Sequence, residues 1–200
     1  QELGAALEKL CLLAETAVLH GHRLLVLSDK DLADDQAPIP ALLAVSAVNS
    51  HLVRQGLRTS VSIILETGEA REVMHMALLL GYGASAINPY LAFETIAAMA
   101  RNRELSAELS GTKAIENYIA GMCKGLLKVM SKIGISTLRS YRSAQVFEAV
   151  GLSHALVARY FEGTASRIGG IGLDEIAAEA EARYQSALDE SGRPHAILPS

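Results

Sequence analysis

The feature that most constrains this sequence is a repeated change of hydrophobic period along its first half. A continuous apolar run, typical of a strand buried on both faces, lies at residues 23–28. Residues 59–65, rich in β-branched side chains, and the short stretch 85–88 are also predicted strands. Apolar residues at helical spacing lie before, between and after these predicted strands, at residues 2–19, 41–55, 69–80 and 91–103. Helices that connect successive strands predict parallel pairing with right-handed crossovers. The first half therefore predicts an α/β fold.

The second half is predicted to be mainly helical. Its helical stretches lie at residues 112–132, 138–149, 152–161 and 173–190. We expect Gly134 to end the first of these helices, and Ser136 to close a fourth, very short strand. Residues 1–190 are expected to be folded, whereas residues 191–200, which contain Pro194 and Pro199, read as an exit linker.

Charge and cysteine content argue against several classes of protein. The 200 residues carry a net charge of −4, whereas a general nucleic-acid surface needs a basic excess. Cys11 and Cys123 lie far apart in helical apolar patterns, which favours buried free thiols over a disulfide or a metal pair. Apolar runs too short for a membrane, and a start without a signal peptide, predict a cytoplasmic protein. The start in mid-helix without Met predicts a fragment of a longer polypeptide.

Polar side chains follow each predicted strand, and these are the candidate site residues. They are Ser28-Asp29, Glu66-Thr67, Asn88 and Ser136-Thr137. Because ligands of parallel α/β folds bind at the carboxyl ends of the strands, these groups predict a pocket on one face. Turns and helix caps also require Asp, Ser, Thr and Asn at such positions, so a purely structural role remains open.

Two basic segments are candidate anion sites. Lys128, Lys132, Arg139 and Arg142 surround the break at Gly134, but capping of two consecutive helices gives the same pattern. Arg167 begins a glycine-rich stretch, residues 167–172, just before a predicted helix. That stretch predicts either a phosphate-binding loop or a flexible joint capped by Asp174.

Other motifs do not support cofactor or metal chemistry. Gly81-Tyr-Gly83-Ala-Ser-Ala86 follows a helix and enters a strand, the reverse of the order in a nucleotide-binding loop. Asp29, Asp31, Asp34 and Asp35 form a cluster without the Gly and terminal Glu of a calcium loop. The histidines are scattered, and His75 is expected to be a hydrogen-bonded core or interface residue.

Several stretches of the sequence resemble one enzyme family in order and spacing. One is Lys124-Gly-Leu-Leu-Lys-Val-Met-Ser-Lys-Ile-Gly-Ile-Ser-Thr137, and the others lie at residues 24–29, 39–46, 66–68, 78–95, 140–142, 147–152 and 166–170. Together they resemble the large subunit of glutamate synthase, from about residue 7 to residue 190. The resemblance covers the later part of that family's central domain, up to the point where the FMN domain begins.

The resemblance implies a fold and a set of partners. It implies part of a degenerate TIM-like barrel related to FMN-linked oxidoreductases, inside an enzyme that converts glutamine, 2-oxoglutarate and reductant into two glutamates. The amidotransferase and FMN domains of the same polypeptide are the implied partners. FMN and an iron–sulfur cluster are implied for the whole enzyme and no cofactor for this segment, because the catalytic Cys and the cluster cysteines are missing here. The electron donor, ferredoxin or a pyridine nucleotide, stays open.

Two hypotheses follow from the sequence. In the first, the chain is a structural and ammonia-channel segment of glutamate synthase, inactive alone, whose uncovered strand edges lead it to self-associate. In the second, it is an autonomous module that binds a small anion or phosphate through Ser136, Arg139 and Arg167. Neither hypothesis involves nucleic acid or a membrane.

Overall fold

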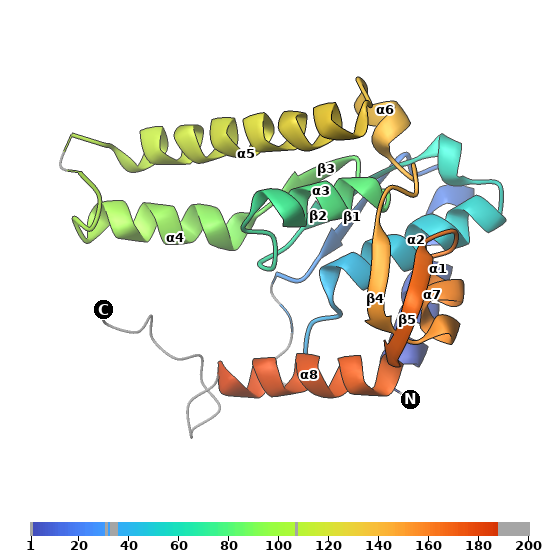
Figure 1. The fold of residues 1–200 in the computed structure, drawn as a ribbon. Coiled ribbons are helices and arrows are strands. Elements are labelled where there is room, and N and C mark those ends of the chain that lie inside the picture. The colour runs from blue at the N-terminus through green and yellow to red at the C-terminus, as the bar shows by residue number, and fades with distance from the viewer. Residues whose placement is uncertain (1, 31, 33–35, 107, 188–200) are drawn as a thin grey trace.

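The first half of the chain alternates helices and strands as predicted. The computed structural model describes residues 2–30, 32, 36–106 and 108–187 (Figure 1). In chain order its first elements are α1 (Glu2–Leu19), β1 (Leu24–Ser28), α2 (Ala41–Arg54), the 3-10 turn η1 (Arg58–Ser60), β2 (Ser62–Glu66), α3 (Val73–Gly81), β3 (Ala86–Asn88) and α4 (Tyr90–Arg101). The strands form one parallel sheet in the order β1-β2-β3. The predicted α/β class, with helical crossovers between parallel strands, is confirmed.

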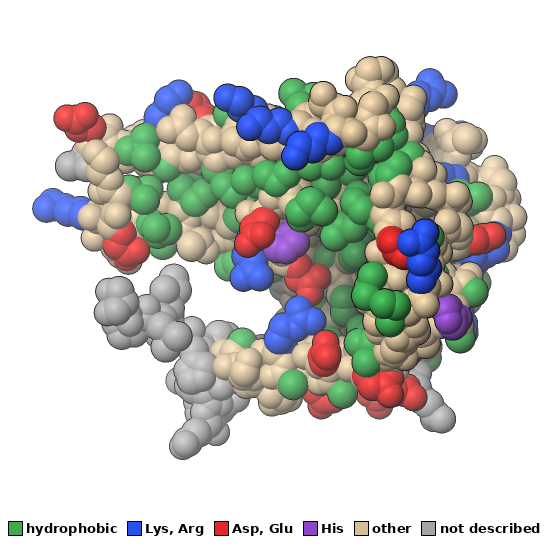
Figure 2. All heavy atoms as spheres, viewed as in Figure 1, with side chains coloured by type: hydrophobic (Ala, Val, Ile, Leu, Met, Phe, Trp, Pro, Cys, Tyr) green, Lys and Arg blue, Asp and Glu red, His purple; other side chains and the backbone are tan. Residues whose placement is uncertain are grey.

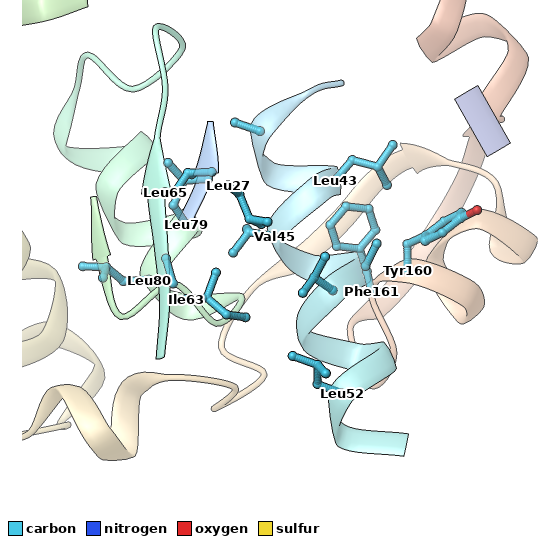
Figure 3. Packing of buried hydrophobic residues seen from close by; sticks show 14 of the residues in the cluster. Leu27, Leu43, Val45, Leu52, Ile63, Leu65, Leu79, Leu80, Tyr160 and Phe161 are labelled. Carbon is cyan, nitrogen blue, oxygen red and sulfur yellow. The ribbon is translucent and has the colours of Figure 1, made fainter. Parts of the chain in front are cut away.

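The two faces of this sheet differ in burial. Leu25 and Leu27 of β1 and Ile63 and Leu65 of β2 are buried on one face, against the apolar side of α2, which includes Val45 and Leu52 (Figure 3). On the opposite face Leu24 and Val26 are 64% and 60% exposed. Burial of each large aliphatic side chain contributes about 1.5–3 kcal/mol, so the α2 side of the sheet provides most of the stability of this half.

The second half departs from the prediction. It contains α5 (Gly111–Ile133), α6 (Leu138–Tyr141), β4 (Glu148–Leu152), α7 (His154–Tyr160), β5 (Ala165–Ile171) and α8 (Leu173–Ser186). The predicted helix over residues 138–149 is wrong, since α6 ends at Tyr141 and β4 begins at Glu148. Residues 135–137 form no strand, so the prediction of a strand closed by Ser136 is also wrong.

Strands β4 and β5 are parallel and pair with each other in a separate two-stranded sheet, with two irregularities of register. Their sequences carry three glycines, Gly151, Gly169 and Gly170, which lower local strand propensity and hide the pattern. A Cβ on Gly170 would lie 2.1 Å from the carbonyl oxygen of Gly151, so the glycine permits the close approach of the strands. The glycine-rich stretch is therefore mostly strand, and the prediction of a flexible joint there is wrong.

Helices α4 and α5 form a hairpin that projects from the sheet (Figure 1). The Ser110 side chain caps the start of α5 by accepting a hydrogen bond from the Lys113 N–H at 3.2 Å. Gly134 ends α5 in the left-handed conformation, with φ of 80°, as predicted. A Cβ on Gly125 would come within 2.4 Å of Val73, so this glycine lets α5 approach α3 closely.

Two further predictions concern single residues and the chain end. Both cysteines are free, but Cys11 is buried whereas Cys123 is exposed, so the prediction of buried thiols is right for Cys11 and wrong for Cys123. The predicted exit linker at residues 191–200 lies outside the described residues. Within those residues, no helix combines the length and apolar character that a membrane crossing requires.

Candidate functional site

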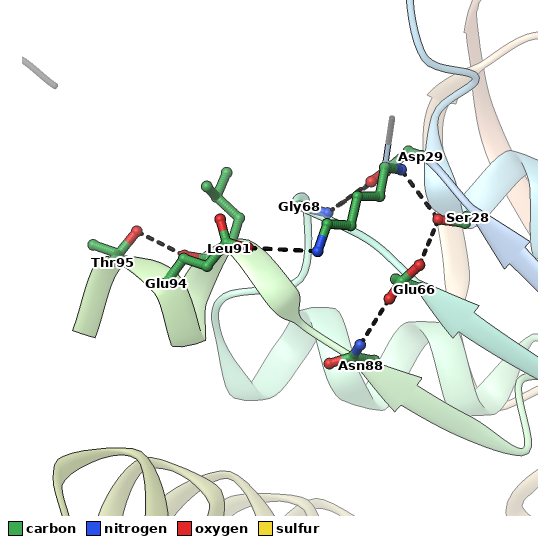
Figure 4. Close-up of polar contacts among 9 residues, drawn as sticks. Ser28, Asp29, Glu66, Gly68, Asn88, Leu91, Glu94 and Thr95 are labelled. Carbon is green, nitrogen blue, oxygen red and sulfur yellow. Dashed lines mark hydrogen bonds and ion pairs between the residues drawn. The ribbon is translucent and has the colours of Figure 1, made fainter. Parts of the chain in front are cut away.

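Three of the predicted site residues meet at the carboxyl ends of the sheet. The carboxylate of Glu66, at the end of β2, accepts a hydrogen bond from Ser28 Oγ at 2.7 Å and one from Asn88 Nδ2 at 3.0 Å (Figure 4). The strand register places these side chains side by side, because Ser28 pairs with Glu66 and Glu66 with Asn88. A single carboxylate thus joins the ends of all three strands.

Asp29 forms a second set of contacts at the same edge. Its carboxylate accepts hydrogen bonds from the hydroxyl of Thr67, at 2.5 Å, and from the N–H of Gly68, at 3.0 Å. Thr67 is fully buried, and its own Oγ accepts a hydrogen bond from the N–H of Glu69. Glu69 in turn accepts a hydrogen bond from the N–H of Ala41, the first residue of α2. Asp29 therefore fixes the turn between β2 and α3, and that turn positions the start of α2.

Tyr90 and Lys30 extend the cluster toward α4. The Lys30 ammonium lies 5.2 Å from the centre of the Tyr90 ring and 3.6 Å from a carboxylate oxygen of Glu94. Burial, together with the charge of Asp29 and a hydrogen bond to it, raises the pKa of Tyr90 to about 12. The tyrosine therefore stays a neutral hydrogen-bond donor at any physiological pH.

A cavity of about 800 Å³ lies beside these residues. Ser28, Asp29 and Glu66 line part of it. Side chains of α1, β1, α8 and residues 36–44 line the rest, most of them apolar but with Glu2, Lys9, Glu181 and Gln185 among them. The polar cluster thus forms part of the wall of an open hollow with a mixed apolar and polar lining. This convergence confirms that Asp29, Glu66 and Asn88 share one edge of the sheet.

Ser136, Thr137 and Arg139 lie elsewhere, and their predicted convergence with the other three is wrong. Thr137 caps the four-residue helix α6, where its hydroxyl oxygen accepts a hydrogen bond from the N–H of Ser140. The chain just after α6 contacts the opposite end of the sheet, because Arg142 donates a hydrogen bond to Ser85, the residue before β3. The physical reason is that residues 135–137 form no strand. These residues therefore do not reach the edge of the sheet where β1, β2 and β3 end.

Arg167 is also separate from the strand-end cluster. It lies in β5 of the second sheet, is largely exposed, and faces Glu148 of β4 at 3.6 Å. A carboxylate beside it partly neutralises its charge, and its backbone belongs to a strand rather than to a loop. The structure therefore gives Arg167 a cross-strand partner within the second sheet.

A partly buried arginine network at the amino ends of the strands was missed from the sequence. Arg58 donates hydrogen bonds to Asn49 Oδ1 at 2.6 Å, to the Val61 carbonyl at 2.6 Å and to the Gly83 carbonyl at 2.7 Å. Burial, and to a smaller extent the nearby charge of Arg142, lowers the pKa of Arg58. One signal was available in the sequence: an arginine placed between a helix-ending glycine and a buried strand.

The remaining motifs have structural roles or stay untested. His75 is half-buried and its Nδ1 accepts the N–H groups of Arg71 and Glu72, so it caps α3 rather than binding a metal. Gly81 ends α3 and Gly83 precedes β3, which confirms the helix-to-strand order that excludes a nucleotide loop. The described residues contain no group of three potential metal ligands, and Asp31, Asp34 and Asp35 lie outside them.

Comparison with known proteins shows the family of this chain. The family model for the glutamate synthase central domain matches residues 1–153. The chain belongs to the glutamate synthase central-domain family. The large chain of glutamate synthase [NADPH] from Bacillus subtilis is 50% identical over 190 residues, which cover 95% of this chain and 12% of that protein.

More distant glutamate synthases show the same coverage. Glutamate synthase [NADH] from Schizosaccharomyces pombe is 43% identical over 190 residues, and ferredoxin-dependent glutamate synthase from Pyropia yezoensis is 42% identical over 196 residues. This chain spans 9% and 13% of those two proteins. It therefore corresponds to a small part of the length of its curated relatives.

Among solved structures, a flavocytochrome b2 variant with pyruvate bound is similar, with a TM-score of 0.49 and 16% sequence identity. The alignment covers 66% of this chain and 31% of that chain. At this level the similarity does not bear on ligands.

Proposed function

We propose that this chain is a structural and ammonia-channel segment of a glutamate synthase, the enzyme that converts glutamine, 2-oxoglutarate and reductant into two molecules of glutamate. Membership of the central-domain family and 50% identity to a glutamate synthase large chain support this proposal. In it, the segment holds the amidotransferase and FMN domains of the same polypeptide in position. In this proposal it lines the path of ammonia and supplies no group that reacts with the substrates.

The observation that carries the proposal is the strand-end cluster beside the cavity. Glu66, Asp29 and Asn88 are already engaged with neighbouring side chains or backbone, so they form a preorganised polar wall rather than a set of free ligands. Ammonia is small and has to be kept from bulk water to avoid loss and protonation. A hollow that mixes apolar side chains with strand-end polar groups that are already engaged suits passage of such a molecule better than its tight binding. The proposal requires the neighbouring domains to close this open hollow from bulk water.

The chain's own residues do not fit the cofactors of the whole enzyme. Its two cysteines are fewer than the four thiolates that usually hold an iron–sulfur cluster, and the described residues contain no group of three potential metal ligands. Of the cations predicted to bind an anion, Arg139 lies in α6 and Arg167 in the second sheet, so they do not form one phosphate site. We therefore assign FMN and the cluster to other parts of the enzyme. Relatives named for NADPH, NADH and ferredoxin share this segment, so it does not determine the electron donor.

A chimaeric enzyme tests this function. The segment replaces its counterpart in the Bacillus subtilis large chain, with Glu66→Ala in the segment and Glu162→Ala as the control. Glu162 is exposed and pairs only loosely with Arg54, at 3.4 Å. We measure glutamine hydrolysed per glutamate formed, and glutamate formed from added ammonium.

We expect Glu66→Ala to raise the glutamine consumed per glutamate, because ammonia escapes at the altered wall. Synthesis from added ammonium should stay within about twofold, since the reacting groups lie elsewhere. The control should preserve the ratio. An unchanged ratio in a folded Glu66→Ala enzyme would contradict the channel role.

A further inference from the structure

Charge is strongly segregated along this chain. Residues 117–147 contain five cations and no carboxylate. Since the whole chain has a net charge of −4, the remaining residues carry a net charge of −9 against +5 for this segment. A molecule divided in this way has complementary surfaces on a single chain.

The cations of α5 form a ridge on its exposed side. Lys124, Lys128 and Lys132 are spaced by four residues and exposed, and Figure 2 shows lysine and arginine side chains in a row along the upper helix. None of the three pairs with a carboxylate among the described residues. Leu127 lies between them and is 63% exposed. We call these four residues the basic ridge.

The basic ridge lies on α5, a helix that buries few of its residues against the rest of the chain. Helix α4 has no buried residue and α5 buries only Ala114 and Met130 among the described residues of the hairpin. The outer side of α5 therefore has no neighbour within the described chain. An exposed leucine beside cations gives this helix an apolar point within a polar surrounding, the arrangement of an interface core and its rim.

Helix α8 offers a complementary surface. It carries Asp174, Glu175, Glu179 and Glu181 against one cation, Arg183. Its exposed side presents Ala178 and Ala182 beside Glu175 and Glu179. We call Glu175, Ala178, Glu179 and Ala182 the acidic face. Glu175 and Glu179 have the same four-residue spacing as Lys124 and Lys128, and the small alanines leave room for Leu127.

We propose that the basic ridge of one copy of this chain docks on the acidic face of α8 in a second copy. Helices α5 and α8 lie along the upper and lower sides of the view in Figure 1, with roughly parallel axes and opposite chain directions. A two-fold axis parallel to them brings each α5 onto the α8 of the other copy. The dimer then contains two equal contacts, which is the arrangement of an isologous interface.

The occupant is a protein surface rather than a nucleic acid. Three lysines around an exposed leucine match alternating carboxylates and alanines, whereas a nucleic-acid face needs a longer basic track and groups that stack on bases. Exposed ion pairs are weak singly, so the association is modest and requires low salt. The unpaired edge of β1, with Leu24 and Val26, offers a different and apolar route to association that salt does not weaken.

Sedimentation equilibrium of the whole 200-residue chain tests the proposal. It compares wild type with the double variants Lys124→Glu/Lys128→Glu and Glu175→Lys/Glu179→Lys, in roughly 20 mM and roughly 300 mM salt, between which the screening length falls about fourfold. The control is Arg101→Glu/Arg103→Glu, which makes the same charge change near the tip of the hairpin. Circular dichroism checks that each variant is folded, and the single change Lys128→Glu serves if a double variant is not.

We expect wild type and the control to dimerise in low salt and to dissociate in high salt. Each double variant should weaken the dimer at least about tenfold, because both contacts then set like charges together. An equimolar mixture of the two variants should recover dimers, since both contacts in the mixed dimer are again complementary. A monomeric wild type, dimers insensitive to salt, or a mixture that stays monomeric would each overturn the proposal.

Discussion

The two ends of the β1-β2-β3 sheet are both polar, but they are built differently. At the amino ends, one partly buried guanidinium, that of Arg58, holds a helix and two loops through three short hydrogen bonds. At the carboxyl ends, the carboxylates of Glu66 and Asp29 hold strands and a turn beside an open cavity. The first network stabilises the fold, whereas the second also faces a space that another molecule can enter.

This difference follows from what surrounds each network. A buried charge without its hydrogen bonds is expensive, so the amino-end network tolerates no missing partner. The carboxyl-end carboxylates can be rehydrated from the cavity when a partner is lost. Substitutions at the amino end should therefore reduce stability strongly, while those at the carboxyl end should change titration and function more than stability.

The largest effect is expected for Gly83→Ala. Gly83 has φ of +120°, and a Cβ there would lie 2.4 Å from the side chain of Asn49. Backbone strain and overpacking together should lower the free energy of unfolding by roughly 4 kcal/mol. The control is Gly56→Ala, at φ of +70° with no atom within 4 Å, for which we expect a loss of about 1 kcal/mol. Urea unfolding measures both, and equal losses would show that the Asn49 contact adds nothing.

Arg58→Met should have the next largest effect. It leaves Asn49 Oδ1 and two carbonyl oxygens without their donor, which should lower the free energy of unfolding by about 3 kcal/mol. Arg54→Met is the matched control, because Arg54 makes one exposed ion pair. This substitution should lower the free energy of unfolding by less than about 1 kcal/mol. Urea unfolding midpoints compare the two variants. If they are equally stable, the amino-end network is not the stabilising one.

At the carboxyl end, stability should fall as pH rises from about 10 to about 12. The pKa of Tyr90 is raised to about 12 in the folded chain, first by burial and then by Asp29, so the unfolded chain releases this proton at lower pH. The stability linked to the neutral phenol is present below pH 10 and lost as pH passes the folded pKa. In thermal unfolding at alkaline pH, the Tyr90→Phe variant should lose less stability between about pH 10 and about pH 12 than the wild type does.

Asp29→Asn provides the control for that titration. It removes the neighbouring charge but not the burial, so it should bring the pKa of Tyr90 partly back toward 10. Ultraviolet absorbance of tyrosinate follows this change directly. An unchanged titration in Asp29→Asn would separate Tyr90 from the strand-end cluster.

The smallest effect is expected for Arg139→Ala. Arg139 is exposed and lies in α6, on neither network, so unfolding should change by less than about 0.5 kcal/mol. Isothermal titration with inorganic phosphate should show no saturable binding in either protein. Saturable binding that the substitution removes would instead support the anion-binding hypothesis and give the molecule a third polar region.

The sequence predicted some parts of this molecule well because their signals are local. The alternation of helices and parallel strands follows from changes of hydrophobic period, and the end of α5 at Gly134 follows from one residue's freedom to adopt positive φ. Asp29, Glu66 and Asn88 were found together since each directly follows or ends a recognisable strand. These inferences needed no knowledge of distant contacts.

Other parts were decided by tertiary structure. Strands β4 and β5 exist because they pair with each other, and their glycines hide that pairing from any local pattern. Arg58 reaches Asn49 and Gly83 only after α2, β2 and α3 are in place, and Ser136, Thr137 and Arg139 go to the other side because no strand carries them forward. The α/β class and three residues of the strand-end cluster could be predicted from the sequence, since hydrophobic period and element order are local. The tertiary structure alone decided which polar groups meet, because hydrogen-bond partners distant in sequence are chosen by packing.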